Sequence, residues 1–77
     1  MITSDQIRAA RALLKWSAED LAKEAGVGIA TVRRFELDTG VPSGQVRILG
    51  ALKVALEAGG VEFVGTPDNR PGVRLIR

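Results

Sequence analysis

Apolar side chains recur at helical spacing through most of the chain and alternate with polar ones only near its end. Ile7, Ala10 and Leu14 lie three or four residues apart, and the same spacing returns in later segments. This period places apolar side chains on one face of a helix. The pattern predicts four helices, over residues 4–15, 18–25, 29–37 and 44–58.

Residues that start or stop helices flank these segments. Thr3 with Gln6 three positions later has the pattern of a capping box. Gly26 follows the second helix and can take the left-handed conformation that ends helices. Ser43 is a candidate cap for the fourth helix.

The second helix has the best defined start. Ser17 is a natural cap, and acidic residues follow it in the first turn, where the helix dipole favours negative charge. Trp16 and Leu21 then occupy the two positions of a hydrophobic staple. We therefore interpret Trp16 as a packing residue rather than a ligand-stacking one.

The last segment has a different period. Residues 61–64 (VEFV) and 73–76 (VRLI) alternate with period two, and Gly, Pro, Asp and Asn fill the segment 65–72 between them. This predicts a β-hairpin with a long loop. Two strands alone are marginal in water, so the hairpin must pack on the helices or pair with another chain. The fold class is mainly α: a helical domain (1–58) and a C-terminal hairpin (59–77).

Composition narrows the function classes. The chain has 77 residues and a net charge of only +2, with arginines outnumbering lysines, so an anionic partner is allowed but not required. Apolar runs are too short for a membrane span, and no secretory leader opens the chain. With no cysteine there are no disulfides or thiolate metal sites, and we expect a cytoplasmic protein.

Catalysis is not expected. The sequence lacks histidine, cysteine and tyrosine, which removes the usual nucleophiles and groups that titrate near neutral pH. The acids of the second helix suit a solvated first turn, and no glycine motif that cradles phosphate occurs. No cofactor, metal or small-molecule ligand is indicated.

Two short helices joined by a tight glycine turn form the outline of a helix-turn-helix. The stretch WSAEDLAKEAGVGIATVRRFELDTGVPS, residues 16–43, resembles the Cro/Xre, or phage-repressor-like, helix-turn-helix family. The resemblance rests on the cap at Ser17, the turn at Gly26 and Val27, and the small and apolar positions between them. It implies the repressor-like four-helix fold and double-stranded DNA as partner.

The third helix would then enter the major groove, where its first residues meet base edges. Ala30, Arg33, Arg34 and Leu37 share one face, which Ile29 borders. The family pattern places base reading on Ile29, Ala30 and Arg34. The DNA backbone would be contacted by Ser17, Gly28, Thr31, Arg33 and Arg47. The alternative is that both arginines only solubilise a surface helix.

Four family positions bear on the details of this hypothesis. Arg11 and Glu36 occupy places that often form an ion pair, which would fix the angle of the recognition helix. Ala18 stands where many members carry glutamine, and Gly28 where Ser or Thr is frequent. These differences change the expected details of docking rather than DNA binding itself.

The sequence thus predicts a transcriptional repressor that binds a two-half-site operator as a homodimer. We expect the hairpin to form the dimer interface with the fourth helix as a possible contributor, through the apolar residues Val61, Phe63, Val73 and Leu75. The alternative is that the hairpin closes the monomer's own core. A rival function on the same fold is an antitoxin-like or anti-regulator module that binds a protein.

Overall fold

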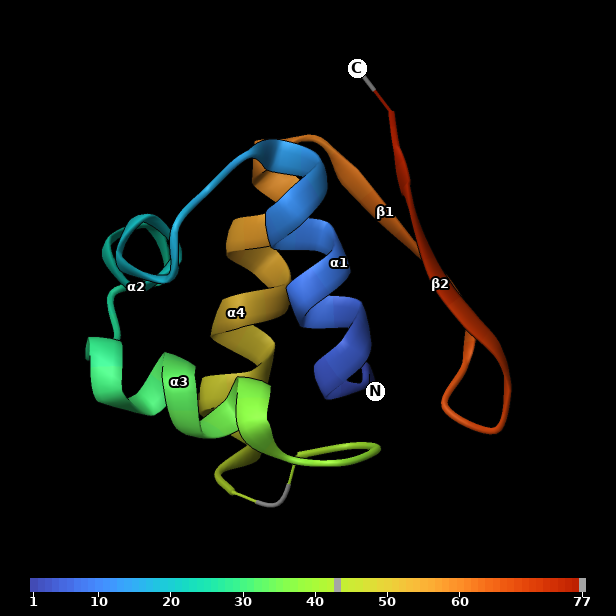
Figure 1. Cartoon of the computed structure of the whole chain (residues 1–77), viewed down its shortest axis with the longest axis horizontal. Coiled ribbons are helices and arrows are strands. Elements are labelled where there is room, and N and C mark those ends of the chain that lie inside the picture. Colours follow the sequence, from blue (N-terminus) through green and yellow to red (C-terminus); the bar gives the residue numbers. More distant parts are fainter. Residues whose placement is uncertain (43, 77) are drawn as a thin grey trace.

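The computed structural model describes residues 1–42 and 44–76. Within them the chain forms four helices followed by an antiparallel two-stranded hairpin (Figure 1). The elements are α1 (Ser4–Leu14), α2 (Ala18–Ala25), α3 (Ile29–Leu37), α4 (Val46–Gly59), β1 (Val61–Thr66) and β2 (Asn69–Leu75). The predicted fold class is confirmed, and the helix bounds agree with the apolar pattern to within two residues.

Reciprocal side-chain caps fix the starts of α1 and α2. Thr3 Oγ1 accepts the N–H of Gln6 at 3.1 Å, and Gln6 Oε1 accepts the N–H of Thr3 at 2.8 Å. Ser17 and Asp20 form the same arrangement at the start of α2, at 3.0 and 2.8 Å. Each box satisfies two backbone donors that a helix start leaves unpaired.

α4 begins without such a cap. Gln45 precedes its first turn and makes no capping hydrogen bond, and the cap predicted at Ser43 lies outside the described residues. The helix ends where Gly60 takes a φ of +116°. Its stability therefore rests on the packing of its apolar side, as for most helices in proteins.

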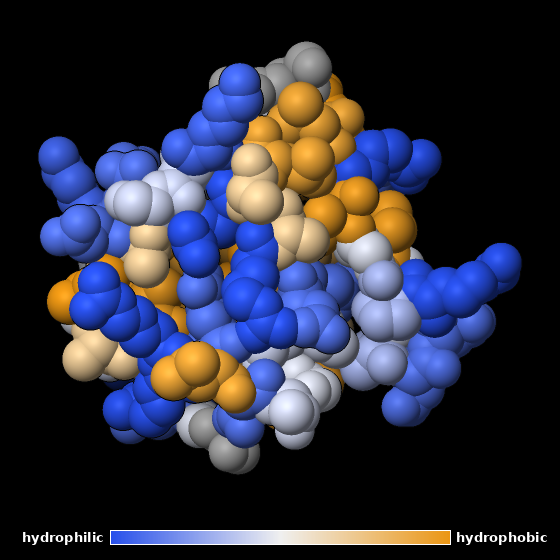
Figure 2. Space-filling model, in the orientation of Figure 1, coloured by the Kyte–Doolittle hydropathy of each residue, from blue (hydrophilic) through white to orange (hydrophobic). Residues whose placement is uncertain are grey.

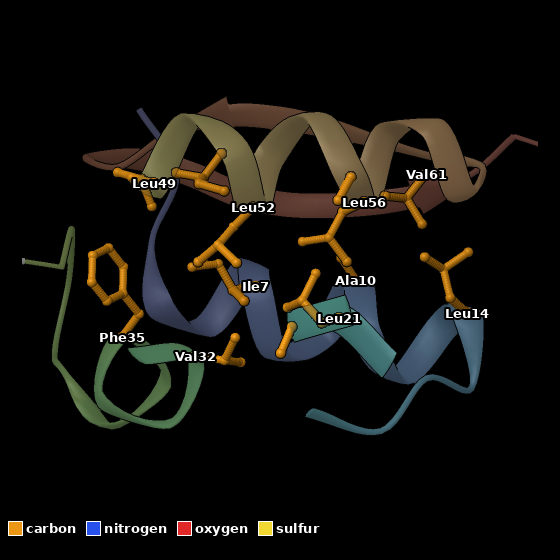
Figure 3. Packing of buried hydrophobic residues seen from close by; sticks show 13 residues of the cluster. Ile7, Ala10, Leu14, Leu21, Val32, Phe35, Leu49, Leu52, Leu56 and Val61 are labelled. Atoms are coloured by element: carbon orange, nitrogen blue, oxygen red, sulfur yellow. The ribbon is translucent and has the colours of Figure 1, made fainter. Parts of the chain in front are cut away.

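One core joins the four helices to the hairpin. Figure 3 shows Leu49, Leu52 and Leu56 pointing from one side of α4 toward the other helices. The side chains that are at most 1% exposed and dominate the core are Ile7, Leu21, Val32, Phe35, Leu52, Leu56 and Val61. Burying a side chain of this size contributes roughly 1.5–3 kcal/mol, so the core fixes how α2 and α3 sit on α1 and α4.

Trp16 packs where α4 ends. It is half-buried against the core, which confirms the packing role predicted for it. A Cβ added to Gly59 would lie 2.8 Å from both Trp16 Cζ2 and Leu14 Cδ1. The glycine therefore lets the indole and the leucine approach the backbone of α4.

The hairpin differs from the prediction in its loop. The strands run to Thr66 and from Asn69, so the expected long loop is a two-residue turn at Pro67 and Asp68. The hydrogen-bonded pairing of the two strands is irregular between Val64 and Thr66, where Gly65 takes a φ of +75°. Gly and Pro in this segment suggested a loop, but a bulge and an edge strand also accommodate them.

The hairpin packs across α1. Gln6 Nε2 donates to the carbonyl oxygens of Val64 at 3.2 Å and Gly72 at 2.9 Å. Val61 is buried in the core, and Phe63 and Val73 pack against it. The two strands are thus covered on one face by the helices of their own chain.

Candidate nucleic-acid interface

A tight turn sets α3 against α2. Gly26 has a φ of +71° and ends α2, and the N–H of Val27 donates to the Ala22 carbonyl at 3.0 Å. Val27 packs against the core, and Gly28 precedes the first turn of α3. Figure 1 shows α3 crossing the N-terminal end of α4, so α3 has one side on the core and one toward solvent.

The two sides of α3 are sharply different. Val32, Phe35 and Glu36 are buried. The exposed residues follow one another along the opposite side and are Ala30, Arg33, Arg34 and Leu37. Leu37 is 84% exposed, whereas Ile29 is half-buried against the core. Of the three predicted base-reading residues, Ala30 and Arg34 are thus exposed to solvent, and Ile29 is only partly exposed.

The adjacent residues Arg33 and Arg34 have different surroundings. The Arg34 guanidinium carbon lies 5.8 Å from the centre of the Phe35 ring. An exposed cation–π contact of this kind contributes about 0.5–1 kcal/mol, less than the roughly 1–3 kcal/mol of a bidentate contact to guanine. Arg33 instead lines an open hollow of about 450 Å³ together with Arg8, Glu36 and Leu37.

Arg11 and Glu36 meet behind this face in a two-point ion pair. Arg11 Nε donates to Glu36 Oε2 at 2.8 Å, and Arg11 Nη2 donates to Oε1 at 3.0 Å. A third donor of Arg11, Nη1, binds the Trp16 carbonyl at 3.0 Å. The hydrogen bond to Glu36 raises the pKa of Arg11. The pair joins α1 to the last turn of α3.

Two more residues of α1 hold the end of α3, and the sequence reasoning missed both. Ser4 Oγ donates to the Phe35 carbonyl at 2.7 Å. Arg8 donates to the Glu36 carbonyl and also pairs with Asp5. Carbonyls at a helix end need such partners. Because Ser4, Arg8 and Arg11 are spaced i, i+4, i+7, a polar stripe on α1 was the available signal.

The sequence model that describes the helix-turn-helix family matches residues 7–57. This covers two thirds of the 77 residues, from inside α1 to the end region of α4. The chain belongs to the Cro/Xre-type helix-turn-helix family. Its members are DNA-binding regulatory domains, and α2 and α3 occupy the helix-turn-helix itself. No curated protein matches the chain.

The predicted backbone contacts of this helix-turn-helix lie at helix starts. Ser17 Oγ accepts the N–H of Asp20. Gly28 supplies no side-chain cap, although its carbonyl accepts the N–H groups of Thr31 and Val32 at 3.1 and 3.2 Å. Arg47 is exposed in the first turn of α4, while Thr31 is half-buried.

The carboxylate of Asp20 bears on the role expected for Ser17. Hydrogen bonds from the Ser17 N–H and hydroxyl lower the pKa of Asp20, so this carboxylate is charged at neutral pH. A phosphate at Ser17 would therefore lie beside a negative charge. Arg33 and Arg47 are both exposed, and Arg33 shares its hollow with Glu36.

The residues expected at a dimer interface lie mostly inside the monomer. Val61 is buried, and Phe63 and Val73 pack on the core. Leu75 is 41% exposed, and Leu13 and Ile76 are also exposed apolar residues. Figure 2 shows apolar surface over the C-terminal end of α1 and the adjoining part of the hairpin. A dimer that used the hairpin would have to use this outer part.

Over residues 1–42 and 44–76, no helix is long and apolar enough to cross a membrane. The same residues hold no group of three metal-ligating side chains. The exposed face of α3 is the candidate site, because it lies on the surface and belongs to the helix-turn-helix of a family of DNA-binding regulatory domains.

Proposed function

We propose that the chain is a transcriptional repressor that binds a two-half-site operator in the cytoplasm as a homodimer. The observation that carries the proposal is that α3 has one buried side and one exposed side. One side is anchored in the core and held by α1, and the other offers small residues first and arginines one turn later. The major groove is wide enough to admit such a helix.

The small residues and the arginines of the exposed side each have a role in this proposal. Ala30 approaches the bases closely because its side chain is small, and Ile29 contacts a thymine methyl at the border. Arg34 leaves the Phe35 ring to bind a guanine edge, since the contact it gains is the stronger one. Arg33 and Arg47 bind phosphates, with Ser17, Gly28 and Thr31 as weaker backbone contacts.

The operator can be found without knowing the regulated genes. Fragments bound by the wild-type chain are selected from random double-stranded DNA and sequenced. A two-fold dimer predicts two related half-sites about one helical turn apart. A selection that enriches no sequence, or binding that does not weaken as salt rises, would contradict the proposal.

A protein-binding role is the second candidate, and one observation favours it. Leu37 is 84% exposed on the same side as the arginines, and large exposed apolar side chains can mark protein contacts. In the DNA hypothesis Leu37→Ser leaves the selected half-site unchanged. In the protein hypothesis no half-site exists to be selected, so the two are separated by the same experiment.

A further inference from the structure

Arg70 has an unusual backbone conformation for its place in the chain. Among the residues that the structure describes, two non-glycine residues have a positive φ: Lys15, at +59°, and Arg70, at +52°. Lys15 is the cap that ends α1, a position where the left-handed conformation is common. Arg70 instead lies within β2, where this conformation is unfavourable for a residue with a Cβ.

A bulge in the hairpin imposes this conformation on Arg70. Between two regular pairs of the hairpin, β1 has one residue, Gly65, and β2 has two, Arg70 and Pro71. In a bulge with a left-handed first residue, that residue is usually glycine. Here it is an arginine, and glycine stands at the facing position, where a Cβ would collide with the Arg70 carbonyl. Because bulges re-aim side chains and retained strain often marks a functional site, the arginine needs a reason.

The Arg70 side chain is available for a partner. It is exposed, and Pro67 and Pro71 restrict the backbone on either side of it. Arg74 of the same strand is paired with Glu62 at 2.9 Å, whereas no ion pair formed within residues 1–42 and 44–76 includes Arg70. A backbone that is already rigid loses little freedom on binding, so this exposed cation suits an anionic partner.

The hairpin turn lies at the end of the molecule where DNA is expected. Figure 1 shows this turn at the same end as α3 and the start of α4, with the C-terminus at the opposite end. The longest extent of the domain is 29 Å, which is less than one helical turn of DNA, about 34–36 Å. A duplex that holds α3 in its major groove can therefore reach the hairpin turn within the same helical turn.

We propose that Arg70 binds a phosphate of the DNA backbone beside the base pairs that α3 reads. This inference rests on the proposed function and adds a contact from outside the helix-turn-helix. Phosphate contacts set the register and orientation of a protein on the duplex, so the hairpin turn helps to fix the angle of α3. The strain at Arg70 then has a reason, because glycine would relieve it but would remove the cation.

Asp68 provides a test of opposite sign. It is exposed two residues before Arg70, and its carboxylate repels a phosphate that approaches the hairpin turn. Asp68→Asn should therefore strengthen binding to the selected operator, and more at low salt than at high salt. Unchanged affinity at low salt would contradict a phosphate at this turn.

Anisotropy titrations on the selected operator compare wild type with Arg70→Gly, Arg70→Lys and Arg74→Ala. We expect Arg70→Gly to raise the dissociation constant several-fold on all sequences alike, and to reduce the salt slope by about 1 for each hairpin that binds. Arg70→Lys should keep most of the affinity, because lysine also binds phosphate. Arg74→Ala removes a cation that is already paired and should change the affinity much less. Wild-type affinity in Arg70→Gly would overturn the proposal.

Stability and footprints separate a DNA contact from a structural role. Arg70→Gly should keep or raise the thermal midpoint, because glycine takes a positive φ without strain, and should lose one stretch of backbone protection in hydroxyl-radical footprints. A lower thermal midpoint with an unchanged footprint would assign Arg70 to the fold and overturn the proposal. The preferred half-site should stay the same in all variants. A failure at Arg70 therefore leaves the proposed function standing, whereas a wild type that selects no DNA contradicts both.

Discussion

Arg11 and Glu36 join the first helix to the last turn of the recognition helix through two hydrogen bonds, of 2.8 and 3.0 Å. The Glu36 side chain is 9% exposed and that of Arg11 25%. With Ser4 and Arg8 on the neighbouring carbonyls, the pair determines where α3 ends on the surface of α1. The angle at which α3 would meet DNA therefore depends on residues that lie behind the interface.

Breaking this pair should be costly. Glu36→Gln keeps the shape of the side chain but leaves the Arg11 charge partly buried without its partner. We expect the free energy of unfolding to fall by about 2–3 kcal/mol, below the range for a fully buried pair because Arg11 is partly exposed. Chemical denaturation measures the change.

The chain supplies a matched control for that substitution. Glu57 pairs with Lys53 at 3.1 Å on the surface of α4, where both side chains are about two fifths exposed. Glu57→Gln should change the free energy of unfolding by less than about 0.5 kcal/mol. Equal effects of the two substitutions would show that the Arg11–Glu36 pair has no special structural role.

Ser4 should hold the end of α3. Its side chain is buried, and its hydroxyl donates to the Phe35 carbonyl at 2.7 Å. Ser4→Ala leaves that carbonyl without its donor, which costs about 1–3 kcal/mol. Hydrogen exchange should speed up at the last amides of α3 and stay unchanged in α2. Uniform acceleration in both helices would instead indicate global destabilisation.

The capping box of α2 should lose stability in acid. The Ser17 N–H, then its hydroxyl, lower the pKa of Asp20 below its ordinary value of 3.8. The stabilisation by the carboxylate is therefore fully present above pH 3.8 and is lost as pH falls through the lower pKa of the folded state. The stability difference between wild type and Asp20→Asn should be constant near neutral pH and shrink below about pH 4. A difference that stays constant down to pH 2 would contradict the assignment.

The bulge in the hairpin should require glycine. Gly65 has a φ of +75°, and a Cβ there would lie 2.1 Å from the Arg70 carbonyl oxygen. The left-handed conformation alone costs a non-glycine residue about 1–2 kcal/mol, so Gly65→Ala should destabilise the fold by more than that.

Gly72→Ala is the control, because its Cβ would lie 3.4 Å from Val64 Cγ2. It should change the free energy of unfolding much less. Similar losses for both variants would mean that the strand, rather than the bulge, is sensitive to any side chain.

How far the sequence predicts the structure depends on the range of the interactions. The helices follow from local signals: apolar spacing, the caps at Thr3 and Ser17, and the glycine that ends α2. The hairpin was placed correctly, but its turn was not, because Gly65 and Pro71 are compatible with a loop or an irregular strand. Packing against the helices, including the hydrogen bonds from Gln6 on α1, selects the strand.

The candidate site shows the same limit. The exposed face of α3 could be predicted from the helical spacing of its residues, and the Arg11–Glu36 contact from the family pattern. Ser4 and Arg8 lie in a polar stripe on α1, but the stripe does not indicate which backbone carbonyls they bind, because those carbonyls are more than 25 residues away. The inward face of the hairpin likewise depends on how the strands pack, since its apolar residues suit a core or an interface equally.

The most direct test of DNA reading by α3 is fluorescence anisotropy on the selected operator and on single-base variants, with wild type, Arg34→Ala and Arg47→Ala. We predict that Arg34→Ala loses about 1–3 kcal/mol of binding free energy and its preference at one base position. Arg47→Ala should weaken all sequences alike and reduce the salt slope by about 1. An Arg34→Ala variant with wild-type affinity and unchanged base preference would contradict the placement of α3 in the major groove.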